Sequence, residues 1–272
     1  ELSWSTDFNY SKNKNEVIAL GGENEPIYSK GSAGVRHITR VGDAVGSYYG
    51  WVVEGIYQSQ SEIDSAPTDK MAKAPRPGDF RFKDVNGDGI IDSDDRTITG
   101  SYNPDYIWGI TNRFKYKNFD LSIFFQGVEG REILNLTARH MKNGEANFNS
   151  YDVLNNRWIS ESQPGDGKTP RADRSTGTHG NNNRPSSYQV EDGSYARLKN
   201  LTIGYTLPKS MSEKYADNIR LYFTAKNLAT WTDYIGFNPE VSLQSQNMLT
   251  QGEDYGAYPL SVSLVFGFNV TF

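Results

Sequence analysis

Strict alternation of apolar and polar residues near the end of the chain limits the folds that this sequence can adopt. From Leu260 to Phe272 every even position is apolar, and the odd positions are Ser, Gly, Asn or Thr with the exception of Val265. A period of two predicts a β-strand with one apolar and one polar face, because successive side chains point to opposite faces. Strands of globular proteins usually have about 5–6 residues, whereas a tilted membrane-spanning strand needs about 9–11. The length of this segment therefore favours a membrane β-barrel.

The same alternation recurs along the chain. Apolar stripes lie within residues 2–10, 106–116, 121–125, 201–207 and 219–225. A further apolar run, Val17 to Leu20, follows the polar residues Ser11 to Asn15, and we expect it to form another strand, which gives roughly seven strands in total. Lys117-Asn118 separates two of the segments, and we expect Asn118 to take the positive φ of a tight turn.

The connections between these segments alternate in length. The short ones are residues 11–15, 117–118 and 208–217, and the long ones are 22–104, 129–194 and 228–259. Alternation of short and long connections is typical of outer-membrane barrels, which have short periplasmic turns and long extracellular loops. The sequence therefore predicts an all-β, antiparallel transmembrane barrel segment whose C-terminus is periplasmic. Within the second long connection, residues 132–141 and 152–159 are expected to form short helices.

Composition excludes several classes of function. The net charge of −5 gives no broad basic surface, so nucleic acid is not an expected partner. Cysteine is absent, which excludes disulfides and Cys-based zinc sites within this sequence. No apolar run approaches the roughly 20 residues of a membrane helix. The sequence opens at Glu1 and Leu2 directly in a strand-like pattern without a signal peptide, and we expect the chain to be part of a longer protein.

Residues 84–95, in the long connection 22–104, have the spacing of a calcium-binding loop. Oxygen-bearing side chains stand at loop positions one, three, five, nine and twelve, a glycine stands at position six, and the residue at position seven offers its carbonyl. The predicted ligands are Asp84, Asn86, Asp88, Ile90 through its carbonyl, Asp92 and Asp95. The alternative is an ordinary acidic turn, because Asp95 stands where the longer Glu is usual. A bound Ca²⁺ ion is expected to stabilise the loop and not to take part in chemistry.

No arrangement of residues predicts an enzyme. His37, His140 and His179 are far apart in the sequence, and no serine lies in a nucleophile-elbow motif. The charged residues Arg113, Lys115, Arg220 and Lys226 fall on the polar faces of the stripes, where solvated positions of the barrel wall are more usual than substrate contacts.

Five aromatic residues of the long connections allow two interpretations. They could stack on sugar rings or pack against a lid protein, and aromatic residues also mark membrane interfaces. The sequence assigns no substrate-binding residue among them. These aromatic residues are Tyr48, Tyr49, Trp51, Trp231 and Tyr234.

Several strings together resemble one family, the SusC/RagA family of TonB-dependent outer-membrane transporters. The resemblance covers most of residues 75–272, and its strength lies in the order and spacing of strings that would each be weak alone. Phe266 departs from the pattern, since the family's C-terminal assembly signal tends to have a polar residue there. The matching strings are Pro77 to Asp92, Tyr116 to Gly127, Tyr195 to Pro208 and Gly267 to Phe272.

This resemblance implies that residues 1–272 are the C-terminal part of a barrel of about twenty-two strands in the outer membrane. It implies active import of glycans or peptides, energised by TonB through a segment upstream of this chain, together with a SusD-like surface lipoprotein. On this interpretation the chain forms part of the lipid-facing wall of the barrel and some of its extracellular loops.

Three alternatives are weighed against this interpretation. A soluble β-sandwich also has alternating strands, but its strands and loops are usually shorter than those expected here. A calcium-stabilised surface adhesin would not transport, and it would need no plug or TonB-contacting segment. A passive porin would also lack the plug, and loops of this length disfavour it.

Overall fold

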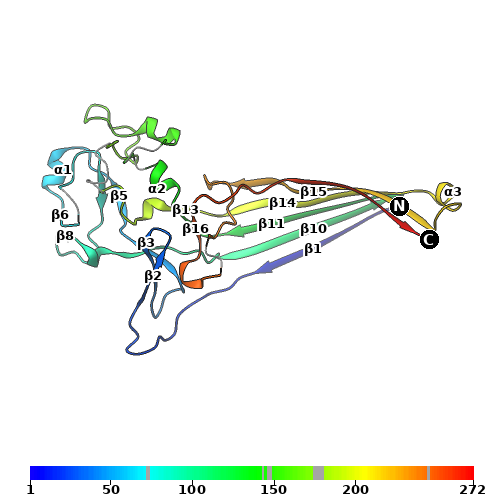
Figure 1. Ribbon diagram of the computed structural model, residues 1–272, viewed down its shortest axis with the longest axis horizontal. Coiled ribbons are helices and arrows are strands. Elements are labelled where there is room, and N and C mark those ends of the chain that lie inside the picture. The colour runs from blue at the N-terminus through cyan, green and yellow to red at the C-terminus, as the bar shows by residue number, and fades with distance from the viewer. Residues whose placement is uncertain (72–73, 143, 146–148, 174–180, 244–245) are drawn as a thin grey trace.

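A computed structural model of the chain describes residues 1–71, 74–142, 144–145, 149–173, 181–243 and 246–272. A six-stranded antiparallel sheet extends from a lobe that the long loops form at one of its ends (Figure 1). In order across the sheet, the strands are β1 (Leu2–Ser11), β10 (Tyr106–Tyr116), β11 (Phe119–Glu129), β14 (Tyr195–Thr206), β15 (Asn218–Thr232) and β17 (Ser263–Thr271).

Shorter elements lie in the connections between these six strands. The strands among them are β2 (Ile27–Gly31), β3 (Gly34–Thr39), β4 (Ser47–Gly50), β5 (Val53–Ile56), β6 (Thr68–Asp69), β7 (Phe80–Phe82), β8 (Ile90–Ile91), β9 (Thr97–Gly100), β12 (Glu132–Asn135), β13 (Val190–Asp192) and β16 (Glu253–Asp254). The α-helices are α1 (Gln60–Asp64), α2 (Ala138–Met141) and α3 (Lys209–Ser212), and the 3-10 helices are η1 (Ser93–Asp95), η2 (Asp152–Asn156), η3 (Ser187–Gln189) and η4 (Met248–Thr250).

Three long loops join the strands at one end of the sheet, and short connections join them at the other. The first loop is residues 12–105, the second is 130–194 and the third is 233–262, whereas residues 117–118 and 207–217 make the short connections. Both termini lie at the end with the short connections, beside α3 (Figure 1). The predicted alternation of short and long connections is therefore present.

The strand register places the apolar stripes on one face of the sheet. Residues that pair directly across antiparallel strands point to the same side, and a single row across all six strands illustrates this. The row is Trp4, Phe114, Leu121, Ile203, Phe223 and Phe266. Trp4 is 66% exposed and Phe266 is 84% exposed, so no described part of the chain covers them. We call this surface the apolar face.

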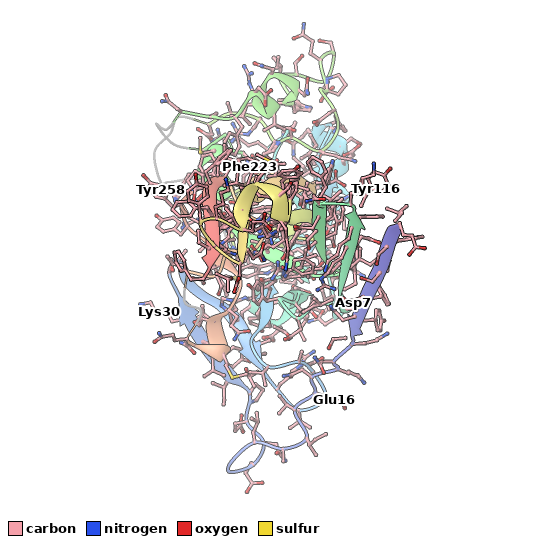
Figure 2. All side chains as sticks on the ribbon, turned by 90° about the vertical axis from the view of Figure 1, so that its right-hand side faces the viewer. Asp7, Glu16, Lys30, Tyr116, Phe223 and Tyr258 are labelled. Carbon is pink, nitrogen blue, oxygen red and sulfur yellow. The ribbon has the colours of Figure 1, made fainter. Side chains whose placement is uncertain are left out.

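The opposite face is polar, as predicted for Arg113, Lys115, Arg220 and Lys226. Arg113 pairs with Asp7 on β1, and Arg220 pairs with Asp120 on β11 across the intervening strand β14. Figure 2 looks at the sheet from the end with the termini and shows Phe223 and Asp7 on opposite sides. A soluble β-sandwich would bury the apolar face against a second sheet, which is not the arrangement of the described residues.

Several sequence predictions of local structure are wrong. Val17 to Leu20 forms no strand; instead Val17 N–H donates to Asp43 O at 2.9 Å within the first loop, so the sheet has six strands and the loop begins at residue 12 rather than 22. The residue with positive φ in the tight turn is Lys117, at 53°.

The second loop also differs from prediction. Residues 132–135 are strand β12 because they pair with β13 and β16, and only Ala138–Met141 is helical in the segment expected to be one helix. In the other segment expected to be helical, residues 152–159, only Asp152–Asn156 form a helix, and it is a 3-10 helix. None of the helices in the described ranges has the length and apolar character needed to cross a membrane.

We predict that Gly127→Ala destabilises the sheet. The ring of Trp108 lies against Gly127, and a Cβ added there would be 2.1 Å from Trp108 Cε2. Overpacking of this kind typically costs about 1–3 kcal/mol. In the full-length protein, the folded form seen by gel electrophoresis without heating should be lost at a lower temperature. Gly21→Ala is the control, because a Cβ at Gly21 meets nothing within 4 Å. Equal melting of both variants would contradict the prediction.

Candidate functional site

The three long loops pack into one body at the end of the sheet. In one apolar cluster, Trp51, Phe80 and Phe82 of the first loop pack with Trp158 and Tyr188 of the second. In two others, Tyr48 of the first loop meets Leu134 and Leu136 of the second, and Ile133 of the second meets Tyr234 of the third. Strand β12 of the second loop also pairs in parallel with β16 of the third. We call this body the loop cap.

Most of the five aromatic residues that could have contacted a sugar or a lid protein are instead part of this core. Tyr48 is 0% exposed, and its hydroxyl contacts the carbonyls of Glu132 and Gly252 at 3.0 and 3.1 Å. Trp51 and Tyr234 are also buried, and Tyr49 stacks under Arg96. Trp231 lies in strand β15 and not in a loop, and it is 55% exposed on the apolar face. Three of the five residues are therefore core residues of the cap, which sequence reasoning did not distinguish.

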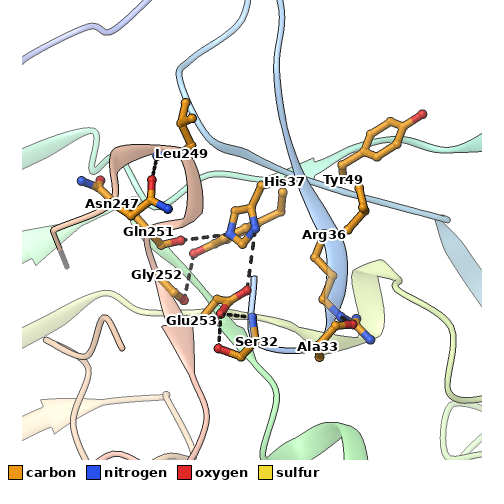
Figure 3. Close-up of polar contacts among 12 residues, drawn as sticks. Ser32, Ala33, Arg36, His37, Tyr49, Asn247, Leu249, Gln251, Gly252 and Glu253 are labelled. Carbon is orange, nitrogen blue, oxygen red and sulfur yellow. Dashed lines mark hydrogen bonds and ion pairs between the residues drawn. The ribbon is translucent and has the colours of Figure 1, made fainter. Parts of the chain in front are cut away.

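A buried polar junction joins the first and third loops around Glu253 (Figure 3). Glu253 on β16 is fully buried, and its Oε2 accepts hydrogen bonds from Ser32 N at 2.9 Å and Ser32 Oγ at 2.7 Å. His37 on β3 is also fully buried, with its Nδ1 3.7 Å from Glu253 Oε1. Gly31 permits this approach, because a Cβ there would lie 1.7 Å from Glu253 Oε1.

The geometry of this junction does not make a nucleophile. The Ser32 hydroxyl donates to Glu253 and not to His37, so the imidazole is not placed to remove the serine proton. His37 Nε2 lies 3.2 Å from Gln251 O, a carbonyl that can only accept, so Nε2 carries the proton. Burial lowers the pKa of the His37 imidazole, although the nearby Glu253 acts in the opposite direction. The junction therefore serves to hold the loops together.

Arg36 lies beside this junction and has an unusual environment. Its side chain is 2% exposed, and its polar contacts are to Ala33 O at 3.1 Å and to Gln189 Oε1. Burial, with Arg139 nearby, lowers the pKa of Arg36 to about 9. Arg36 thus bonds the first loop to η3 of the second loop through neutral acceptors.

Other buried ion pairs connect the loops in the same way. Asp79 of the first loop accepts from Arg171 Nε of the second at 2.8 Å, and Arg184 of the second loop pairs with Asp69 of the first. A hydrogen bond within the third loop adds to these ion pairs: the Tyr234 hydroxyl donates to Asp254 at 2.5 Å, and burial raises the pKa of this tyrosine. Removing one partner of a buried pair usually costs about 3–5 kcal/mol. Such pairs favour one arrangement of the three loops.

The predicted calcium ligands lie in one turn of the first loop. Asp84 Oδ1 and Oδ2 accept from the N–H groups of Gly87 at 2.6 Å and Gly89 at 2.8 Å, and Gly89 has φ 81°. Asp88 Oδ1 accepts from Ile90 N at 2.8 Å, while Asn86 and Asp88 are exposed. The backbone thus makes the sharp turn that the spacing requires.

Asp92 and Asp95 complete the loop. Asp92 caps helix η1, and Asp95 is fully buried with its two oxygens accepting from Val85 N and Asp92 N, both at 2.8 Å. The predicted metal-ligating atoms are all oxygens, which are the hard ligands that Ca²⁺ prefers. Across the described ranges, however, no three or more His, Asp or Glu side chains are arranged to hold a metal ion.

His37 and His140, the two histidines within the described ranges, lie on different elements, β3 and α2. His37 is in the junction, His140 on α2 has its ring centroid 6.3 Å from that of Tyr255, and His179 lies outside the described residues. Sequence reasoning missed the role of His37, because its partner Glu253 is on another loop and no local motif connects them.

Comparisons with known proteins agree with this architecture. TonB-dependent receptor P3 of Formosa agariphila is 36% identical over 282 residues, and SusC of Bacteroides thetaiotaomicron is 25% identical over 282 residues. Both comparisons cover 100% of this chain, which spans 27% of the length of the first relative and 25% of the second. A solved structure of the RagAB peptide transporter matches all of the chain with a TM-score of 0.73 at 22% identity. No protein-family model matches the chain.

Over its whole length the chain is therefore similar to the C-terminal portion of TonB-dependent receptors, SusC among them, and it shares the fold of the RagAB barrel. This confirms the family resemblance and the prediction of an all-β barrel segment. Its relatives are receptors by name and not enzymes.

We predict that the junction opens as the pH falls. Because burial lowers the pKa of His37, the unfolded loop binds a proton below about pH 6.5 more readily than the folded loop does. The free energy that holds the junction closed therefore has its full value above about pH 6.5. Below that pH it decreases by up to about 1.4 kcal/mol per pH unit. Hydrogen exchange of the backbone amides of residues 34–39 in the full-length protein, corrected for intrinsic rates, should show this decrease. We call the change of the opening free energy with pH the slope.

Two variants test the origin of that slope. His37→Gln removes the titrating group and should flatten the dependence on pH, whereas His140→Gln should retain most of it because His140 is not part of the junction. A slope that persists in His37→Gln would show that another group is responsible.

Proposed function

We propose that this chain supplies part of the wall and the extracellular loops of a TonB-energised outer-membrane importer. The observation that carries the proposal is the two-faced sheet, with an exposed apolar face, an opposite polar face, and all three long loops at one end. The relatives over the whole chain are TonB-dependent receptors, which supports nutrient import as the general activity.

The membrane placement follows from the two faces. The apolar face contacts lipid, because most of its side chains are apolar and each of the four inner strands pairs with a neighbour on both sides. Aromatic residues lie near both ends of this face, with Tyr116 and Tyr205 at the short connections and Trp108 and Trp231 towards the loops. By analogy with bacterial barrels, the loop cap lies outside the cell and the C-terminus in the periplasm.

The partners follow from the relatives. SusC and RagAB support a SusD-like surface lipoprotein that closes over the loop cap, and TonB acts through a part of the protein outside this chain. The substrate class is glycans or peptides; a solved relative of the same fold is named a peptide importer. A rigid loop cap gives such a lipoprotein a defined surface to close upon.

Import is tested in the producing bacterium with the full-length gene. Deletion should abolish growth on one polysaccharide or protein digest from a panel, and the intact gene should restore it. Loss of TonB should abolish uptake while the protein remains in the outer membrane at its normal level. Cells that bind the nutrient but take it up equally well with and without this gene would instead support an adhesin.

We also propose that the loop of residues 84–95 binds a structural Ca²⁺ ion. Support comes from the oxygen spacing, the turn at Gly89, and the open side of the loop at Asn86 and Asp88. The ion would draw the side-chain oxygens inward, and the buried anchor at Asp95 fixes the other side of the loop.

Removal of calcium tests this proposal. Addition of Ca²⁺ to the chelator-treated full-length protein should release or absorb heat in calorimetry and raise its melting temperature, and Asp88→Ala should lose both effects. Asp166→Ala, at an acidic residue of the second loop, is the control and should retain them. Absence of heat and of a melting shift in the wild-type protein at millimolar Ca²⁺ would exclude a site.

A further inference from the structure

A cavity lies in the loop cap between the second and third loops. Its volume is about 410 Å³, within the range of about 300–1,000 Å³ that is usual for ligand pockets. Leu136 N and Thr137 N donate to Asp254 O at 2.8 and 3.2 Å, and these hydrogen bonds hold the two walls together. The cavity is therefore a feature of the packed loops and not of the unpaired strands β1 and β17. The lining residues are Thr137, His140, Met141, Asn149, Tyr255 and Gly256.

Two aromatic rings form part of the wall. His140 on α2 and Tyr255, which follows β16, have ring centroids 6.3 Å apart at an interplanar angle of 48°. Tyr255 is 49% exposed, and Thr137 adds a hydroxyl to the lining. An aromatic wall with a few polar groups suits a ring-shaped solute that has apolar faces and a polar rim, as a sugar ring does.

Two arginines beside the cavity have no acidic partner. Arg139 precedes His140 on α2, and its Nε donates to Asn183 Oδ1 at 2.6 Å. Arg36 of the first loop bonds to the neutral acceptors described above. Within the described ranges, neither Nη atom of Arg139 has a hydrogen bond, and no carboxylate lies within 4 Å of either guanidinium. Both charges are thus without a directly bonded counter-ion.

The positive charge of these arginines reaches the cavity. Burial lowers the pKa of the His140 imidazole in the cavity wall, and the charges of Arg139 and Arg36 lower it further. Burial and the charge of Arg139 also lower the pKa of Arg36, against the opposite effect of Glu253. Groups that repel one another's protons in this way create a positive potential, which attracts an anion. A carboxylate or sulfate group would supply the missing counter-ion, because guanidinium groups bind such anions with paired hydrogen bonds.

We propose that this cavity binds an acidic sugar unit of the imported substrate, with the sugar ring against Tyr255 and its carboxylate or sulfate group at Arg139. The proposal rests on the importer function proposed above and names the substrate class as acidic glycans. A sugar is favoured over an acidic peptide because the wall offers flat ring faces, whereas β12, which leads into α2, is already paired on both sides and cannot accept a peptide strand. Arg36 is 2% exposed, so it acts on the bound anion through its charge.

Calorimetry on the purified full-length protein tests this proposal with three acidic probes: oligogalacturonate, oligomannuronate and a sulfated galactan oligosaccharide. We expect at least one to bind, and its methyl ester or desulfated form to bind at least tenfold more weakly. Arg139→Gln, which keeps a donor for Asn183, should lower the affinity for the acidic form at least tenfold. Arg81→Gln is the matched control, because Arg81 pairs with Glu54 in the first loop and should keep the wild-type affinity.

The comparison of acidic and neutral forms uses the wild-type protein and does not depend on the folding of a variant. Equal binding of the two forms, binding of none of the acidic probes, or equal loss of affinity in Arg139→Gln and Arg81→Gln would overturn the proposal. Binding of oligoglutamate in place of the acidic sugars would overturn it as well, in favour of a peptide. These outcomes are separate from import itself, since a strain that needs this gene to grow on a neutral polysaccharide would contradict the acidic substrate class and leave the importer function intact.

Discussion

Backbone pairing in register is the constraint on which the rest of this structure depends. Each of the six long strands pairs with its neighbours in antiparallel fashion, so that directly opposed residues share a face. A shift of one residue would move every apolar side chain to the other face. Because the register is maintained, one surface suits hydrocarbon and the other suits water, and both properties follow from the same set of hydrogen bonds. Bulges between Phe124 and Phe125 and between Leu198 and Asn200 adjust the pairing locally.

Glycines complete the polar face in a way that the alternation does not reveal. A Cβ at Gly204 would lie 2.4 Å from both Arg220 Nη2 and Asp120 Oδ1, so the ion pair lies flat over this glycine. At Gly267 the added atom would be 2.4 Å from Tyr222 Cζ, so this ring also lies along the sheet. At these two positions the long side chains therefore lie along the surface of the sheet and do not extend away from it.

The loop cap shows a different kind of stability. Its elements are short, and strands such as β6, β8 and β16 have two residues each. Short strands contribute few hydrogen bonds, so buried ion pairs and aromatic clusters between loops must supply the cohesion. Asp79 with Arg171 and Glu253 with Ser32 are examples in which the partners belong to different loops or distant segments. Polar contacts of this kind require definite geometry, and a cap built from them presents one shape to its surroundings.

The sequence by itself determined the long strands, their two faces and the alternation of short and long connections, because a period of two over many residues is a local property that pairing preserves. It also determined the acidic turn at residues 84–95, whose glycine and side-chain acceptors act within a few residues of one another. Only the tertiary structure decided that Val17 to Leu20 is not a strand, that Tyr48, Trp51 and Tyr234 are core residues, and that His37 lies against Glu253. These outcomes depend on contacts between residues far apart in the chain. Likewise, the polarity of Asn112 is visible in the sequence, but its hydrogen bonds to Thr6 and Trp4 on the apolar face exist only when β1 pairs with β10.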